Sequence, residues 1–175
     1  LKDGSHIWKR AADLNPGDLV GFPLNYLATS STISKGKDFA ELLGYYVAEG
    51  STDVKSGRVE LTFGPHEEKL ARRAGELMSK VTTNKIVVRF RKGWCVYTCD
   101  MQLSKTLAEW VGTGARNKRL PQWVFTESIE VREALVKALW DGDGWVGLSR
   151  GYTNMVYSTA STTLAYQLFQ LLLSL

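Results

Sequence analysis

The spacing of hydrophobic and polar positions divides the chain into alternating helical and extended segments. Apolar residues recur at helical spacing, which predicts amphipathic helices, over 39–49, 70–78, 103–111 and 130–143. Alternating apolar and polar residues between glycine-containing turns predict strands over 51–54, 58–63, 85–91 and 94–99. Between residues 38 and 114 the predicted order is therefore helix, two strands, helix, two strands, helix.

A second series of elements follows the same order towards the C-terminus. A motif helix, a hairpin and a last helix capped by Ser161 are predicted over 130–143, 147–159 and 162–175. The final two strands and helix of the first series have no counterpart before Leu175. We therefore expect two repeats, the second incomplete. The chain begins with Leu1 rather than Met, which favours an excised piece or a processed product.

Two stretches of similar character open the two series. The first is Leu42 to Gly50, LLGYYVAEG, and the second is Val136 to Gly144, VKALWDGDG. Each is an apolar helical run that closes with an acid followed by glycine, and each has a small residue at its third place. A small residue lets another helix backbone approach closely. A glycine suits the end of a helix.

The acids that close these stretches, Glu49 and Asp143, stand where a helix dipole disfavours negative charge. If the two helices pack side by side, the acids come together. Like charges held close are tolerated when a divalent cation lies between them. The pattern therefore predicts a paired-carboxylate site where two helices end.

Composition constrains the function only mildly. A formal net charge of +4 permits an anionic partner without requiring one. The two cysteines, Cys95 and Cys99, would lie on one face of a strand and indicate no disulfide framework, which favours a reducing, cytoplasmic location. The two histidines form no ligand-spaced cluster with them, so a structural zinc site is not expected.

Both stretches resemble the LAGLIDADG motif of homing endonucleases, with Glu49 and Asp143 at the motif's metal-binding acid. The resemblance implies an α+β fold of pseudo-twofold αββαββα repeats, each with a curved antiparallel sheet that binds DNA, the second truncated here. It implies Mg²⁺ as cofactor, held by both acids and by the backbone carbonyls of Gly50 and Gly144, and double-stranded DNA with a long recognition site as substrate. Each repeat would cut one strand.

Further residues acquire roles from the same resemblance. Lys118, in the run Lys118 to Pro121, matches a family element that supplies a lysine near the scissile phosphates. The alternative is a basic surface loop. Basic residues on the predicted strands are candidates for contacts with phosphates or base edges: Arg58, Lys85, Arg89 and Arg91. The alternative for these four is an ordinary solvated strand face.

The N-terminal region has a different character. The run from Trp8 to Val20, WKRAADLNPGDLV, resembles the segment that follows the N-terminal splicing block of inteins; its turn at 15–18 should lead into a strand over 19–22. The motifs that splicing requires are absent from this sequence, so splicing would belong to a parent intein host protein. The expected divisions are a splicing-domain tail, a linker, a first repeat, a connector and a second repeat, over 1–30, 31–37, 38–114, 115–128 and 129–175. A dimer or a complementing fragment would supply the missing strands.

Three other functions compete with nuclease activity as interpretations of these residues. An EF-hand loop starting at Asp141 is excluded because its twelfth position is Tyr152 rather than Glu. A glycosidase would use a carboxylate pair but gives no role to the repeat or to the basic strand. A catalytically inactive DNA-binding relic or regulator, or an RNA maturase of the same family type, remains the principal alternative, although both acids are present.

Overall fold

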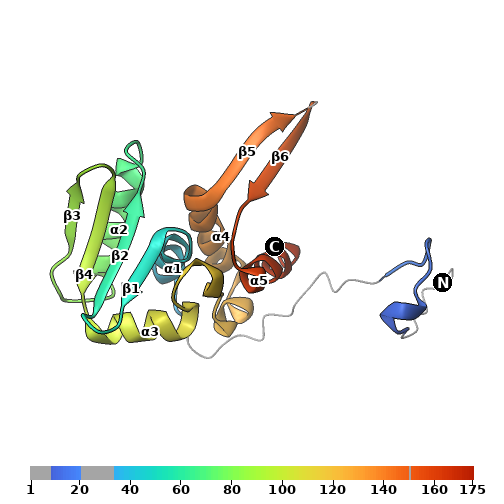
Figure 1. Cartoon of the computed structure of the whole chain (residues 1–175), viewed down its shortest axis with the longest axis horizontal. Helices are drawn as coiled ribbons and strands as arrows, with labels where there is room; N and C mark the ends of the chain where they lie inside the picture. The colour runs from blue at the N-terminus through green and yellow to red at the C-terminus, as the bar shows by residue number, and fades with distance from the viewer. Residues whose placement is uncertain (1–8, 21–33, 150) are drawn as a thin grey trace.

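The computed structural model describes residues 9–20, 34–149 and 151–175. The first series of elements runs in the predicted order, from a motif helix through two hairpins to a closing helix (Figure 1). Its elements are α1 (Lys37–Glu49), β1 (Gly50–Asp53), β2 (Arg58–Phe63), α2 (Glu68–Ser79), β3 (Val87–Phe90), β4 (Trp94–Cys99) and α3 (Met101–Val111). Two short 3₁₀ turns, Ala115–Asn117 and Gln122–Thr126, connect it to the second series.

The four strands of the first series form one antiparallel sheet in the order β1-β2-β4-β3. Helix α2 covers one face of this sheet, where Val59, Leu61 and Val96 are buried. Gly75 in α2 makes this approach possible, because a Cβ atom there would lie 2.9 Å from Cγ2 of Val88. The opposite face of the sheet carries mostly polar residues, as the alternation of the strands predicts.

The second series is shorter and repeats the order helix, hairpin, helix. Its elements are α4 (Ile129–Asp143), β5 (Gly144–Ser149), β6 (Tyr152–Tyr157) and α5 (Thr162–Leu173). The hairpin forms a two-stranded sheet of its own, and its strands begin and end earlier than the sequence predicts. Ser161 caps α5 as expected, since its side chain accepts a hydrogen bond from the Leu164 N–H. The molecule is thus an α+β fold with antiparallel sheets.

Helices α1 and α4 form the centre of the molecule and pack against each other more extensively than any other pair of helices. Gly44 is required at this contact, because a Cβ atom there would lie 2.5 Å from the Leu135 carbonyl oxygen and 2.7 Å from Cβ of Ala138. A Cβ at Gly142 would lie 2.6 Å from Cβ of Ala48. The close backbone approach expected from the small residues of both motifs is confirmed.

The start of α1 differs from the prediction. The helix predicted over 39–49 would leave Asp38, a residue type that suits an N-cap, just before its first turn. The N-cap is instead Gly36, and Asp38 lies inside the first turn. The carboxylate of Asp38 instead pairs with Arg73 of α2 and with Lys80, the residue that follows this helix. The segment before the helix is fixed by Glu127, a buried acid that accepts hydrogen bonds from Oγ of Ser34 and from the Lys35 N–H. Long-range charge pairing therefore outweighs the local capping preference.

The described part of the N-terminal region, residues 9–20, contains the predicted turn. The Asp18 N–H donates to the Asn15 carbonyl at 3.0 Å, and Gly17 has a φ of 97°, in the left-handed region. The strand expected over 19–22 is not present at Leu19 and Val20, and its other half lies outside the described residues, as does most of the expected linker. All residues of the 9–20 segment are exposed.

Candidate active site

The structure places the two motif acids at equivalent positions, each directly before the first residue of a strand. Glu49 is the last residue of α1 and Asp143 is the last residue of α4, and both helices lead directly into hairpins. Because α1 and α4 pack side by side, both carboxyl groups belong to one central site. They are close enough for the charge of Asp143 to influence the pKa of Glu49.

Gly50 and Gly144 follow these acids for a steric reason rather than a conformational one. Both have extended φ and ψ values that any residue adopts. A Cβ atom at Gly50, however, would lie 2.3 Å from Cδ2 of Tyr46, and one at Gly144 would lie 2.3 Å from Cδ1 of Trp140. In each half, an aromatic ring one turn earlier occupies the space beside the helix end. The carboxyl groups therefore stand next to rings, where water is partly excluded.

Lys118 reaches this site from the connector between the two series. Its side chain is only 7 % exposed. The ammonium donates hydrogen bonds to the carbonyl oxygens of Tyr46 at 2.7 Å and Gly50 at 2.6 Å, and it lies 4.5 Å from the centre of the Tyr46 ring. Lys118 thus binds the C-terminal end of α1, where a helix dipole favours a cation. A basic surface loop does not describe this residue.

The electrostatics of the site reflect burial more than charge pairing. Burial raises the pKa of Glu49 to about 7, and the nearby carboxylate of Asp143 adds to the rise. Burial also raises the pKa of Asp143. At Lys118, burial lowers the pKa to about 8, although both acids oppose this change. At neutral pH the site therefore contains carboxyl groups whose ionised form is disfavoured by burial. A nearby cation would stabilise that ionised form.

The residues present fit a magnesium ion of the kind that retains several water ligands. Mg²⁺ in proteins is often held by only one or two carboxylates, and Glu49 and Asp143 supply two. Within the described ranges, no group of three or more His, Cys, Asp or Glu side chains is gathered for metal binding. The Gly50 carbonyl, a predicted ligand, already accepts a hydrogen bond from Lys118.

Two aromatic residues at the second helix end were not singled out from the sequence. Tyr157 of β6 pairs with Gly144 in the strand register, and its ring lies 5.5 Å from that of Trp140. Neither the Tyr157 hydroxyl nor the Trp140 indole N–H has a hydrogen-bond partner among the described residues, although both atoms are buried. Only the strand register brings Tyr157 beside Asp143, so no local sequence signal indicates it.

The predicted DNA-contacting residues fall into two groups. Arg58 and Arg89 come together on the open face of the first sheet, on either side of Tyr97. Their guanidinium carbons lie 3.9 Å and 5.0 Å from the centre of the Tyr97 ring. Arg58 also forms an ion pair with Glu60. The structure therefore builds a compact cluster of two arginines on one tyrosine.

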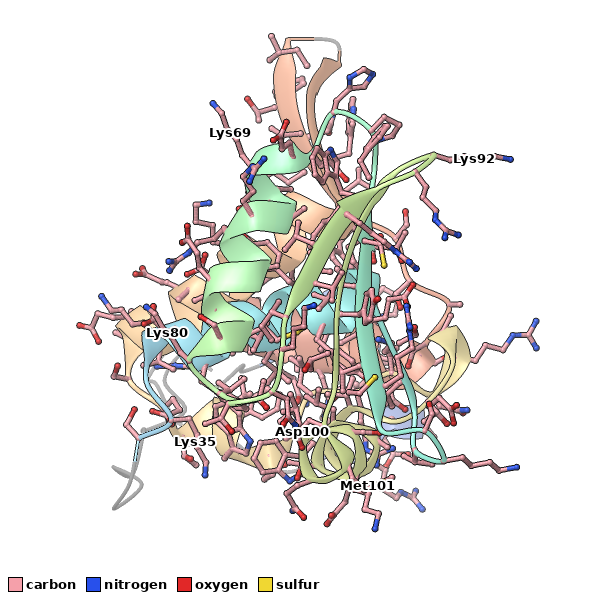
Figure 2. All side chains as sticks on the ribbon, turned by 90° about the vertical axis from the view of Figure 1, so that its left-hand side faces the viewer. Lys35, Lys69, Lys80, Lys92, Asp100 and Met101 are labelled. Carbon is pink, nitrogen blue, oxygen red and sulfur yellow. The ribbon has the colours of Figure 1, made fainter. Side chains whose placement is uncertain are left out.

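Lys85 and Arg91 lie just outside β3, which is shorter than predicted and covers only Val87–Phe90. Both side chains are exposed. Arg91 belongs to the turn between β3 and β4, where its N–H donates to the Gly93 carbonyl, and the neighbouring Lys92 projects from the tip of this turn (Figure 2). Lys85 and Arg91 therefore lie beyond the two ends of β3 rather than within the sheet.

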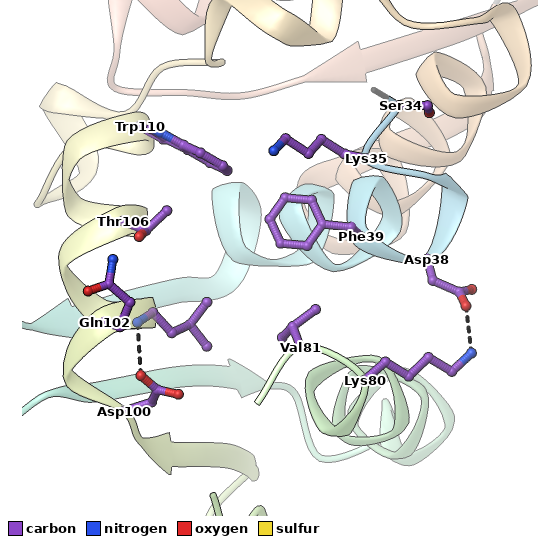
Figure 3. A pocket seen from close by; sticks show the side chains of 11 residues that line it. Ser34, Lys35, Asp38, Phe39, Lys80, Val81, Asp100, Gln102, Thr106 and Trp110 are labelled. Carbon is purple, nitrogen blue, oxygen red and sulfur yellow. Dashed lines mark hydrogen bonds and ion pairs between the residues drawn. The ribbon is translucent and has the colours of Figure 1, made fainter. Parts of the chain in front are cut away.

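A separate groove of about 530 Å³ lies away from the acids, between α1, the end of α2 and α3 (Figure 3). Its wall is apolar at Phe39, Val81 and Trp110, and Lys35 points towards the Trp110 ring at 5.6 Å. The rim is closed on one side by the ion pair between Asp38 and Lys80. The groove contains none of the predicted site residues.

Comparison with known families identifies part of this architecture. Residues 130–175 match the family model described as "LAGLIDADG-like domain". This stretch is LAGLIDADG-like. In the structure, the LAGLIDADG-like stretch comprises nearly all of α4, with Asp143 at its end, followed by the β5–β6 hairpin and α5.

Curated relatives align with most of this chain but are much longer. An ATP-dependent DNA helicase Hel308 from Thermococcus kodakarensis is 37 % identical over 142 residues, covering 78 % of this chain and 12 % of the relative. A replication factor C small subunit from Methanocaldococcus jannaschii is 31 % identical over 180 residues, covering 98 % of this chain and 9 % of the relative. The chain therefore spans about a tenth of the length of these relatives.

Among solved structures, one of those similar to this chain is I-DmoI, crystallised in complex with DNA and Ca. The sequences are 15 % identical, the match covers 62 % of this chain and 58 % of that chain, and the TM-score is 0.44.

None of the helices in the described ranges combines the length and the apolar character needed to cross a membrane.

Proposed function

We propose that this chain is the nuclease part of an intein-encoded homing endonuclease that cuts double-stranded DNA at a long site with Mg²⁺. The observation that carries the proposal is the meeting of Glu49, Asp143 and Lys118 at the paired ends of α1 and α4. A carboxylate pair in a partly desolvated site, with a buried cation beside it, suits chemistry on a phosphodiester. Arg58 and Arg89 on the open sheet face would contact the DNA.

Each residue would have a distinct task. Bound Mg²⁺ would supply a more acidic water and neutralise charge that develops on the phosphate. Glu49 and Asp143 would hold that ion, and its positive charge would stabilise the ionised form of both carboxyl groups, whose pKa values burial raises. Lys118 would hold the end of α1 in place through the Tyr46 and Gly50 carbonyls while its ammonium faces the acid pair.

The intein origin is supported by the pattern of relatives. Proteins with different names, a DNA helicase and a replication factor C small subunit, each contain a stretch similar to this chain that accounts for about a tenth of their length. A segment that recurs in otherwise different proteins behaves as an insert. The parent host protein would then supply the splicing motifs, with residues 1–30 as the tail of its splicing domain.

A second candidate function is DNA binding without cleavage. The observation that favours it is the Gly50 carbonyl, a predicted metal ligand that already accepts a hydrogen bond from Lys118. In a relic or regulator of this kind, the Lys118 ammonium would take the place of the cation, and the sheet would retain its contacts with DNA.

Cleavage of a randomised double-stranded DNA library with Mg²⁺ tests both functions. We expect the chain to cut at one long site, and Glu49→Gln or Asp143→Asn to lower the rate by about 100-fold or more. Asp141→Asn is the matched control, because this carboxylate lies in the same helix but pairs with Lys137. If the chain binds DNA with strong salt dependence and never cuts, the second candidate function is correct.

A further inference from the structure

The second half of the site contains a buried polar group that the proposed function does not use, the hydroxyl of Tyr157. Two constraints fix this residue. The β5–β6 register pairs it with Gly144, the residue that follows Asp143. Its ring lies against Trp140, one helical turn before Asp143, with ring centres 5.5 Å apart. Backbone pairing and ring packing therefore hold the tyrosine at the end of α4.

The surroundings of the hydroxyl favour Asp143 as its partner. The oxygen is buried, and no described residue meets it with ordinary hydrogen-bond geometry. A buried hydroxyl is seldom left unpaired, because it has lost its water partners. Burial raises the pKa of both Tyr157 and Asp143, and the hydroxyl offsets part of the rise at Asp143. Because strand pairing sets Tyr157 opposite Gly144, we assign the adjoining carboxylate of Asp143 as the acceptor for this donor.

The first half of the molecule shows what is special about this position. There the strand residue that pairs with Gly50 is Leu61, which is fully buried and has no donor. The polar donor at that helix end is instead Lys118, bound to the Tyr46 and Gly50 carbonyls. A buried donor thus lies at each helix end, but Lys118 and Tyr157 come from different elements and differ in charge.

We propose that Tyr157 is a positioning residue for Asp143, one of the two carboxylates that would hold the cation. The Tyr157 hydroxyl would donate to one carboxylate oxygen and so limit the orientations that the Asp143 side chain can adopt. This inference rests on the proposed cation site, but it does not require that the chain cut DNA. A partner that orients a metal ligand in this way typically changes metal affinity by about 10- to 100-fold.

The test is cation binding by the whole chain, measured as Tb³⁺ luminescence excited through nearby tryptophan and as displacement of Tb³⁺ by Mg²⁺. Tyr157→Phe removes the hydroxyl and keeps the ring on Trp140. We expect this variant to bind both ions at least about 10-fold more weakly, with an unchanged midpoint of thermal unfolding. Tyr152→Phe, an exposed tyrosine in the same strand, is the control and should bind as the wild type does.

Two further variants separate positioning from packing. Tyr157→Leu, which copies Leu61 of the first half, should lose affinity to the same extent and also lose thermal stability. In an Asp143→Asn background, Tyr157→Phe should cause no further loss, because the two groups act as a unit. Wild-type affinity in Tyr157→Phe, or additive losses in the double variant, overturns the inference.

The outcome also separates this inference from the proposed nuclease. Cation binding that depends on Tyr157, in a protein that never cuts DNA, supports the inference and overturns the nuclease. Cleavage by the wild type with unaltered cation affinity in Tyr157→Phe supports the nuclease and overturns the inference. Absence of cation binding by the wild type overturns both.

Discussion

The carboxyl of Glu49 and the ammonium of Lys118 respond in opposite directions to burial at the end of α1. Burial raises the pKa of Glu49 to about 7 and lowers that of Lys118 to about 8. In both cases the neutral form is the one that the folded chain favours. These residues therefore make the stability of the fold depend on pH. Their combined cost to the free energy of folding is greatest between about pH 7 and pH 8, where both groups are mainly charged.

Replacing Glu49 by Gln should change stability in a pH-dependent way. Because the folded chain binds the Glu49 proton more tightly than the unfolded chain, this contribution is present at low pH and is lost as pH rises through about 7. We expect Glu49→Gln to match the wild type at about pH 4, below the ordinary pKa of a glutamate, and to be more stable by about 1–2 kcal/mol at about pH 8, allowing for solvent screening.

Urea unfolding at both pH values measures this difference. Glu133→Gln is the control, since Glu133 is an exposed acid in the neighbouring helix α4. An equal loss of stability in Glu49→Gln at both pH values would mean that the carboxyl serves an ordinary packing or hydrogen-bonding role. Added Mg²⁺ should stabilise the wild type at about pH 8 and not the variant.

The pairing of α1 with α4 depends on small residues that face each other across the contact. Gly44 meets the Leu135 carbonyl and Ala138, and Gly142 meets Ala48. Since both helices end in the site, the distance between their axes also determines how close the acids come. The same residues that permit packing therefore set the geometry of the carboxylate pair.

Gly44→Ala should destabilise the chain by about 1–3 kcal/mol, because the added methyl group overpacks a tight helix contact. Combining it with Ala138→Gly should restore only part of this loss, since the Leu135 carbonyl, 2.5 Å from the new Cβ, cannot be removed. Denaturant unfolding of the single and double variants gives these energies. Unchanged stability in Gly44→Ala would show that α1 and α4 separate at little cost.

The four-stranded sheet has one face covered by helix α2 and one open face, which carries the cluster of Arg58, Arg89 and Tyr97. With a net charge of only +4, we do not expect general electrostatic attraction to DNA to dominate the binding free energy. Binding to DNA through this face should therefore depend on particular residues. The side of the molecule formed by α2 should contribute little.

Arg89→Ala should weaken binding to duplex DNA and lower the slope of log affinity against log salt by about 1, as expected for loss of one phosphate contact. Lys69→Ala is the control, because Lys69 lies on α2, which covers the other face of the sheet (Figure 2). Fluorescence anisotropy at several salt concentrations measures both slopes. If the two variants change the slope equally, the open face is not the DNA-contacting surface.

The sequence alone predicted the helices, most strands and the two motif acids, because these depend on local periodicity and on motifs that lie within one helix. The close contact at Gly44 was also predictable, since only a small residue fits such a contact. Predictions that depended on competition between local and distant partners were less successful. Asp38 is the example: its capping preference lost to Lys80 and Arg73.

The tertiary structure alone decided which side chains meet. It buried Lys118 against the Tyr46 and Gly50 carbonyls at the end of α1, 72 and 68 positions away in the chain, and it placed Tyr157 beside Asp143 through strand register. It also brought Arg58 and Arg89 to one tyrosine and left Lys85 and Arg91 at the strand ends. The reason is physical: periodicity specifies which face a residue occupies, but register and packing determine what lies opposite that face.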